Sequence, residues 1–108
     1  MALPADYAFE RDLVADCLLA ALAANCLLEV IGQRKARGSG TTVGAPDALL
    51  YCAGHMVPIE FKRAADGRLS KGQVWQMELR RRQGIETRIV RSLVEFVDVV
   101  NECRRAAA

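Results

Sequence analysis

The segment from Gly44 to Lys62, GAPDALLYCAGHMVPIEFK, contains two apolar runs on either side of a short turn. Residues Asp47–Cys52 and Val57–Lys62 are rich in strand-forming side chains and predict two β-strands. The intervening Ala53–Met56 contains a glycine and is short enough to join the two strands as a tight hairpin. The segment therefore predicts an antiparallel pair that carries its few charged residues at the end away from the turn.

Those charged residues are predicted to share one face of the hairpin. Glu60 and Lys62 are two residues apart on one strand, so their side chains point to the same side. A turn centred directly after Gly54 places Asp47 opposite Lys62 and makes Asp47 a diagonal neighbour of Glu60, roughly 7–8 Å away at the backbone. Two carboxylates at this spacing suit a hard cation such as Mg²⁺, and a lysine beside them stabilises charge on a phosphate. The same residues also fit a solvent-facing strand surface with a Lys–Asp pair.

The rest of the chain predicts a small α/β domain over residues 1–108 with a mixed sheet. The first helix, with Asp6 as its N-cap, is apolar on almost every side and is expected to be largely buried. A second helix begins with a capping box formed by Ser70 and Gln73, and Gly84 ends it. In chain order the expected elements are a helix over 7–24, strands over 27–33, 47–52 and 57–62, a helix over 70–83, a strand over 86–90 and a helix over 93–103.

Composition excludes several classes of protein. The 108 residues are 52% hydrophobic and 26% charged, which is typical of a globular domain, and the net charge of +2 does not by itself require a nucleic-acid partner. The longest apolar run, Cys17–Ala24, is far shorter than the roughly 20 residues of a membrane span, and no secretory signal is recognised. The four cysteines form no CxxC pair and are expected to be buried thiols in a reducing cytoplasm.

Three motifs together resemble one nuclease family. Gly44-Ala45-Pro46-Asp47, Ile59-Glu60-Phe61-Lys62 and the Gly67–Gln73 segment GRLSKGQ occur in the order and spacing of the VRR-NUC family, within the PD-(D/E)XK nuclease superfamily. The resemblance extends over about residues 10 to 98. It implies a restriction-endonuclease-like core, α-β-β-β-α-β with a C-terminal helix.

The resemblance also implies roles for single residues. Asp47 and Glu60 would bind a catalytic Mg²⁺ or Mn²⁺ ion, with the backbone carbonyl of Phe61 as a third ligand. Lys62 would position the attacking water and help to neutralise the transition state. Gln73 matches a glutamine beside the site in this family, although its capping box alone also accounts for it.

Two further groups of residues are candidates. Glu10 matches an acidic residue on the first helix of these nucleases and is a possible metal ligand, but a charge in a first helical turn is also favourable without any ligand. The basic run Arg80–Arg82 is interpreted as a favourable helix C-terminus. Contacts to DNA phosphates are expected from polar and basic residues around the site and the glycine-rich loop, namely Arg34, Lys35, Arg37, Thr41, Thr42, Arg63 and Lys71.

The resulting functional hypothesis is a metal-dependent, structure-selective DNA endonuclease. Relatives in the family imply a homodimer that cuts branched DNA such as four-way (Holliday) junctions in DNA repair, in the cytoplasm of a bacterial or virus-infected cell. The alternatives are a flap or end-processing nuclease that acts with a helicase, a restriction-like duplex nuclease, and a non-catalytic DNA-binding subunit with a nuclease fold. No Ser-His-Asp or Cys-His set competes, because His55 in the hairpin turn is the only histidine.

Overall fold

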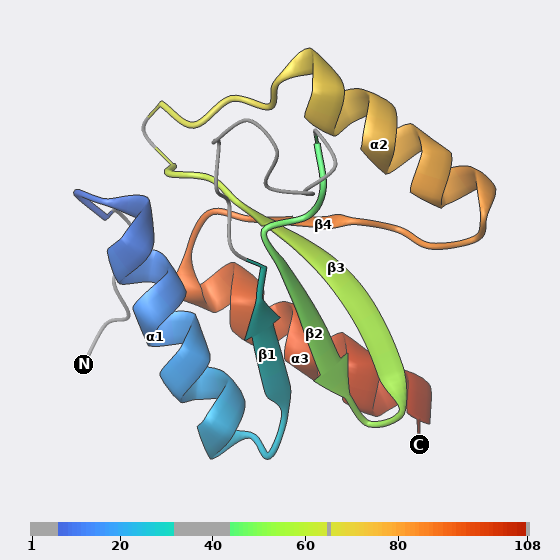
Figure 1. Cartoon of the computed structure of the whole chain (residues 1–108). Helices are drawn as coiled ribbons and strands as arrows, with labels where there is room; N and C mark the ends of the chain where they lie inside the picture. Colours follow the sequence, from blue (N-terminus) through green and yellow to red (C-terminus); the bar gives the residue numbers. More distant parts are fainter. Residues whose placement is uncertain (1–6, 32–43, 65, 108) are drawn as a thin grey trace.

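The computed structural model describes residues 7–31, 44–64 and 66–107 (Figure 1). Its elements follow the predicted order of helix, three strands, helix, strand and helix. They are α1 (Glu10–Ala23), β1 (Leu27–Val30), β2 (Ala48–Cys52), β3 (His55–Phe61), α2 (Lys71–Arg82), β4 (Arg88–Val90) and α3 (Leu93–Ala107). Strands β1 and β4 are shorter than predicted, and α3 extends four residues beyond Cys103.

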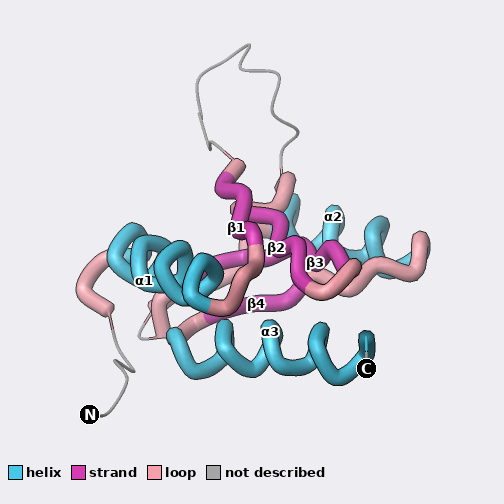
Figure 2. The backbone as a smooth tube through the Cα atoms, turned by 90° about the horizontal axis from the view of Figure 1, so that it is seen from below, coloured by secondary structure: helices cyan, strands magenta, loops and turns pink. Residues whose placement is uncertain are grey.

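The four strands form one mixed sheet in the order β1-β2-β3-β4. The first three strands pair antiparallel, and β4 pairs parallel to β3. Helices α1 and α3 pack against one face of the sheet, and α2 lies over the other face (Figure 2). The predicted fold class, α/β with a mixed sheet, is confirmed.

The register of the β2–β3 hairpin differs from the prediction. Its turn consists of Ala53 and Gly54 alone, with φ values of 52° and 82°, which is the two-residue type I′ geometry. This shorter turn pairs Leu49 with Pro58, whereas the predicted turn paired Leu49 with Glu60. The predicted register was therefore wrong by two residues. Because side chains alternate with a period of two, this shift leaves each residue on its predicted face.

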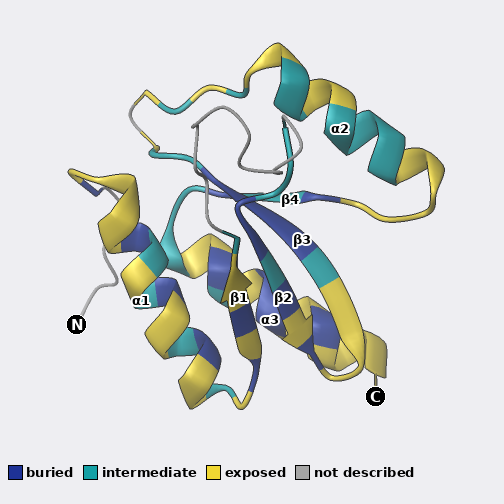
Figure 3. Cartoon of the chain, viewed as in Figure 1, coloured by how far each residue is buried: buried dark blue, intermediate teal, exposed yellow. Residues whose placement is uncertain are grey.

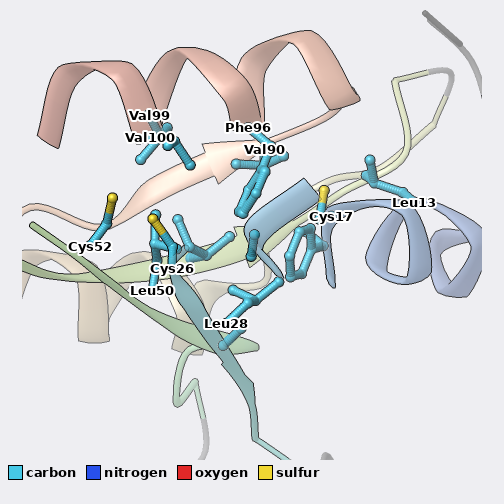
Figure 4. Close-up of a cluster of buried hydrophobic side chains, with 14 of the residues drawn as sticks. Leu13, Cys17, Cys26, Leu28, Leu50, Cys52, Val90, Phe96, Val99 and Val100 are labelled. Atoms are coloured by element: carbon cyan, nitrogen blue, oxygen red, sulfur yellow. The ribbon is translucent and has the colours of Figure 1, made fainter. Parts of the chain in front are cut away.

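The hydrophobic core lies between the sheet and helices α1 and α3 (Figure 4). The sheet contributes alternate residues of β2 and β3, since these point toward the two helices. The largest fully buried apolar side chains are Phe61, Phe96, Leu13, Leu50, Ile59 and Val90. All four cysteines are buried and unpaired, as predicted.

Helix α1 is less buried than its composition suggests. It begins at Glu10, and its N-cap is Phe9, whose side chain makes no capping hydrogen bond. The prediction of Asp6 as the N-cap was therefore wrong, and Asp6 itself lies outside the described residues. One stripe of the helix is buried, whereas Leu19 and Leu22 are 67% and 72% exposed. The expectation of a largely buried helix was wrong, because α1 packs only on β1, β3 and α3 and no described element covers its other side.

Helix α2 begins as predicted but is held mainly by polar contacts. The Ser70 hydroxyl accepts a hydrogen bond from the backbone of Gln73, and the Gln73 side chain accepts one from the backbone of Ser70, which confirms the capping box. The helix has no fully buried residue (Figure 3), and Gly84 follows it with φ +82°. In the described part of the chain, no helix is both long enough and apolar enough to cross a membrane.

Candidate active site

Two buried carboxylates lie side by side where β2 begins and β3 ends. Asp47 directly precedes β2 and, by the observed register, comes level with Glu60 rather than with the predicted Lys62. Glu60 has no exposed surface, and Asp47 is 8% exposed. The backbone N–H of Phe61 donates a 2.8 Å hydrogen bond to Oδ2 of Asp47. The carboxylate pair is therefore closer together than the predicted diagonal arrangement.

Gln73 connects α2 to this pair. Its Nε2 donates a 2.8 Å hydrogen bond to Oε2 of Glu60, while its Oε1 closes the capping box. The same side chain thus closes the capping box and lies beside the carboxylate pair, while its role in catalysis stays a prediction. The other oxygen of Glu60, Oε1, is buried and has no hydrogen-bond partner within the described residues. A buried unpartnered carboxylate oxygen is unfavourable unless another group binds it.

The surroundings of the pair disfavour two negative charges. Burial, followed by the charge of Asp47, raises the pKa of Glu60 to about 7, although Lys62 and Arg80 act in the opposite direction. Burial also raises the pKa of Asp47, although the hydrogen bond from the Phe61 N–H and the charge of Lys62 lower it. Lys62 and Arg80 do not offset the burial of the pair, and an added cation would favour the charged form of both carboxylates.

The donor set fits a hard divalent cation. Two carboxylates, one of which has an unpartnered oxygen, match the oxygen ligands that Mg²⁺ and Mn²⁺ prefer, and Mg²⁺ usually keeps several waters. Among the described residues, no cluster of three His, Cys, Asp or Glu side chains is placed to hold a metal. Further ligands would therefore be backbone carbonyls or water, and the carbonyl of Phe61 stays the predicted third ligand.

The loop after β3 fixes the backbone around Lys62. The N–H of Lys62 donates to the carbonyl of Val90 at 3.1 Å, which extends the β3–β4 pairing by one bond. Arg91 then donates to the carbonyls of Arg63 and Gly67, at 3.1 and 2.7 Å. A Cβ on Gly67 would lie 2.8 Å from Cβ of Lys62, so only glycine lets the loop approach this closely. Lys62 itself is half-buried on the carboxylate face.

Arg80 is a site residue that sequence reasoning missed. It was assigned to the helix C-terminus, yet its Nε donates a 2.7 Å hydrogen bond to Oγ1 of the buried Thr87. Its Nη2 is buried without a hydrogen-bond partner in the described structure, and its charge acts on Glu60. The sequence did contain a signal, because Arg80 lies seven residues after Gln73 and so occupies the same side of α2.

The remaining predicted residues are less well connected to the pair. Glu10 is exposed in the first turn of α1, whereas Asp47 and Glu60 are buried, so its role as a metal ligand stays a prediction. Arg63 is half-buried and forms a 3.4 Å ion pair with Asp66. Lys71 is exposed at the start of α2. The other predicted DNA contacts lie outside the described residues, namely Arg34, Lys35, Arg37, Thr41 and Thr42.

Comparison with known proteins identifies the fold. No protein-family model matches the sequence, and a search of curated proteins found no significant relative. A search of solved structures found one described as a VRR_NUC domain, with a TM-score of 0.65 and 22% sequence identity. The match covers 85% of this chain and 94% of the solved chain. The chain therefore has the VRR_NUC fold, which the sequence motifs predicted.

Proposed function

We propose that this chain is a metal-dependent nuclease that hydrolyses phosphodiester bonds in branched DNA. The observation that carries the proposal is the buried pair of Asp47 and Glu60, with an unpartnered oxygen and with Lys62 on the same face. The likeness to a VRR_NUC domain supports the nuclease class independently of this geometry.

Each residue of the site has a role in the proposed reaction. Asp47 and Glu60 would hold Mg²⁺ or Mn²⁺, together with the carbonyl of Phe61. A cation bound there would supply positive charge to the phosphate and lower the pKa of a nearby water. Lys62 positions the attacking water and offsets the negative charge that develops on the phosphate. Gln73 keeps the Glu60 carboxylate in one orientation through the 2.8 Å hydrogen bond.

The proposed biological form is a homodimer that acts on four-way junctions during DNA repair, in the cytoplasm of a bacterial or virus-infected cell. Two cuts in strands of opposite direction need two sites, and a two-fold dimer supplies them in that arrangement. Exposed apolar side chains on α1, including Leu19 and Leu22, offer one surface for such a contact. A flap nuclease that works with a helicase uses the same chemistry and differs only in the substrate.

The proposal is tested with the wild type, Lys62→Ala and Arg105→Ala. Arg105 is exposed near the end of α3, so its variant loses one positive charge while the site stays intact. Each protein is given labelled four-way junction, 5′ flap, single strand and plain duplex, with Mg²⁺, Mn²⁺ or EDTA. We expect metal-dependent cleavage of the junction by the wild type and Arg105→Ala, and none by Lys62→Ala.

Other outcomes discriminate between the alternatives. Cleavage of flaps or single strands instead of the junction keeps the chemistry and assigns the chain to end processing. Cleavage of plain duplex favours a restriction-like enzyme. Binding of DNA without cleavage under every metal condition refutes the nuclease proposal for this chain and favours a DNA-binding subunit.

A further inference from the structure

The outer side of α2 carries an exposed aromatic ring. Trp75, the only tryptophan of the chain, is 54% exposed. It lies two residues after Gln73, which corresponds to about 200° around the helix, so the ring points away from the carboxylate pair. A ring of this size leaves much apolar surface in water unless a partner covers it.

Positive charges flank this ring. The Arg82 guanidinium lies 5.6 Å from the centre of the Trp75 ring. Lys71 is exposed one turn before Trp75 on the same side of the helix. The one acidic residue on this stretch, Glu78, is already paired with Arg81 at 2.8 Å and with Arg82 at 3.4 Å. The surface around the ring therefore has an excess of positive charge.

An aromatic ring between basic side chains is complementary to a nucleic-acid strand. Its face can stack on a base, and the neighbouring cations can contact the phosphates on either side of that base. An apolar protein partner fits less well, because it would bury these charges without an opposite charge. The stripe composed of Lys71, Trp75 and Arg82, here called the α2 outer stripe, thus matches a phosphodiester chain in both shape and charge.

We propose that the α2 outer stripe binds an unpaired nucleotide of the substrate, with its base stacked on Trp75. The inference rests on the proposed nuclease function and narrows its substrate class. Within a continuous duplex each base is covered on both faces by its neighbours, so only an unpaired base offers a free face. Substrates with an unpaired nucleotide near the branch point, such as flaps and bulges, are therefore expected to bind this stripe more tightly than plain duplex does.

The single tryptophan makes a direct binding test possible. Lys62→Ala protein in EDTA, in which the DNA stays intact, is titrated with a 5′ flap, single strand, four-way junction and plain duplex. We expect the fluorescence of Trp75 to be quenched by the flap and the single strand, and to change little with the plain duplex. The same titrations followed by the anisotropy of labelled DNA report total binding.

Variants at two neighbouring positions separate stacking from folding. Trp75→Ala is expected to weaken flap and single-strand binding about 5- to 150-fold, with Trp75→Phe in between and duplex binding unchanged. Val74→Ala is the matched control, because Val74 is 53% exposed on the same helix and lies outside the stripe. Circular dichroism melts verify that each variant is folded.

Several outcomes overturn the inference. The first is an anisotropy titration that shows flap binding while the fluorescence of Trp75 stays unchanged. The second is a Trp75→Ala variant that binds flap and duplex with equally reduced affinity. Quenching that depends on protein concentration in the absence of DNA would instead assign the stripe to a contact between two copies. Absence of DNA binding also refutes it. None of these readouts requires cleavage, so failure of the nuclease proposal is recognised separately, by an inactive wild type with metal.

Discussion

Replacing Glu60 with glutamine is expected to stabilise the metal-free protein while abolishing its proposed activity. The environment raises the pKa of Glu60 from 4.5 to about 7, so ionising this side chain at higher pH opposes folding. At roughly 1.4 kcal/mol per pH unit, this opposition amounts to about 3 kcal/mol. The glutamine in the Glu60→Gln variant would avoid it, because its oxygen still accepts from Gln73 and its amide can donate to Asp47.

The stability gained by Glu60→Gln is expected to increase as the pH rises. Between pH 4.5 and about 7 the folded protein keeps a proton on Glu60 that the unfolded chain has released. The wild type therefore loses stability as pH rises through this interval, and the loss then stays constant. Glutamine does not titrate. The stability difference is expected to be under about 1 kcal/mol at pH 4.5 and about 3 kcal/mol at pH 8.

Urea unfolding in EDTA at pH 4.5 and 8 measures this difference. About 3 kcal/mol corresponds to a rise of roughly 10–20 °C in Tm for a domain of this size. Glu86→Gln, at an exposed position, is the control for loss of one negative charge and should change little. Adding Mg²⁺ should stabilise the wild type and not Glu60→Gln. Equal stability of wild type and variant at pH 8, or the same difference at both pH values, refutes this account of the site.

Substitutions at Gly44 and Ser70, each with a comparison variant, test how α2 is held over the site. Gly44→Ala places a methyl group against the carbonyl of Gly72 at φ +83°, so we expect loss of both stability and cleavage. Gly54 has a similar φ, but a methyl group there would point into open space, so urea unfolding of Gly54→Ala should show only about 1–2 kcal/mol of destabilisation. Equal destabilisation by Gly44→Ala and Gly54→Ala would contradict the close contact at Gly44. Ser70→Ala removes the hydroxyl that caps Gln73 and should destabilise the protein by about 1 kcal/mol, while Ser70→Asp should restore it; an unchanged melting curve for Ser70→Ala would argue against the cap.

Local sequence patterns predicted what depends on near neighbours. The capping box at Ser70 and Gln73 needs residues three apart, and both of its hydrogen bonds are formed. The order of helices and strands follows from local periodicity, and it was confirmed. That Glu60 shares a face with Lys62 follows from alternation along one strand, and this survives any register shift of two residues.

One error lay within the hairpin turn, and the other errors occurred where distant segments decide the outcome. The hairpin register depended on Ala53, which adopts a positive φ that glycine would normally supply. The exposure of α1 depended on which of its sides met another element. The role of Arg80 depended on where the segment after α2 places Thr87, whose hydroxyl accepts the hydrogen bond from Arg80.

The sequence by itself determined the α/β architecture, the helix start at Ser70 and the grouping of acidic and basic residues on one face. These features are set by periodicity and by contacts within a few residues. Only the tertiary structure decided that Asp47 lies level with Glu60, that one Glu60 oxygen is left unpartnered, that Gln73 contacts Glu60 and that the charge of Arg80 acts on it. Burial and hydrogen bonding between separate elements produce these features, because desolvation and pairing arise only when the elements pack together.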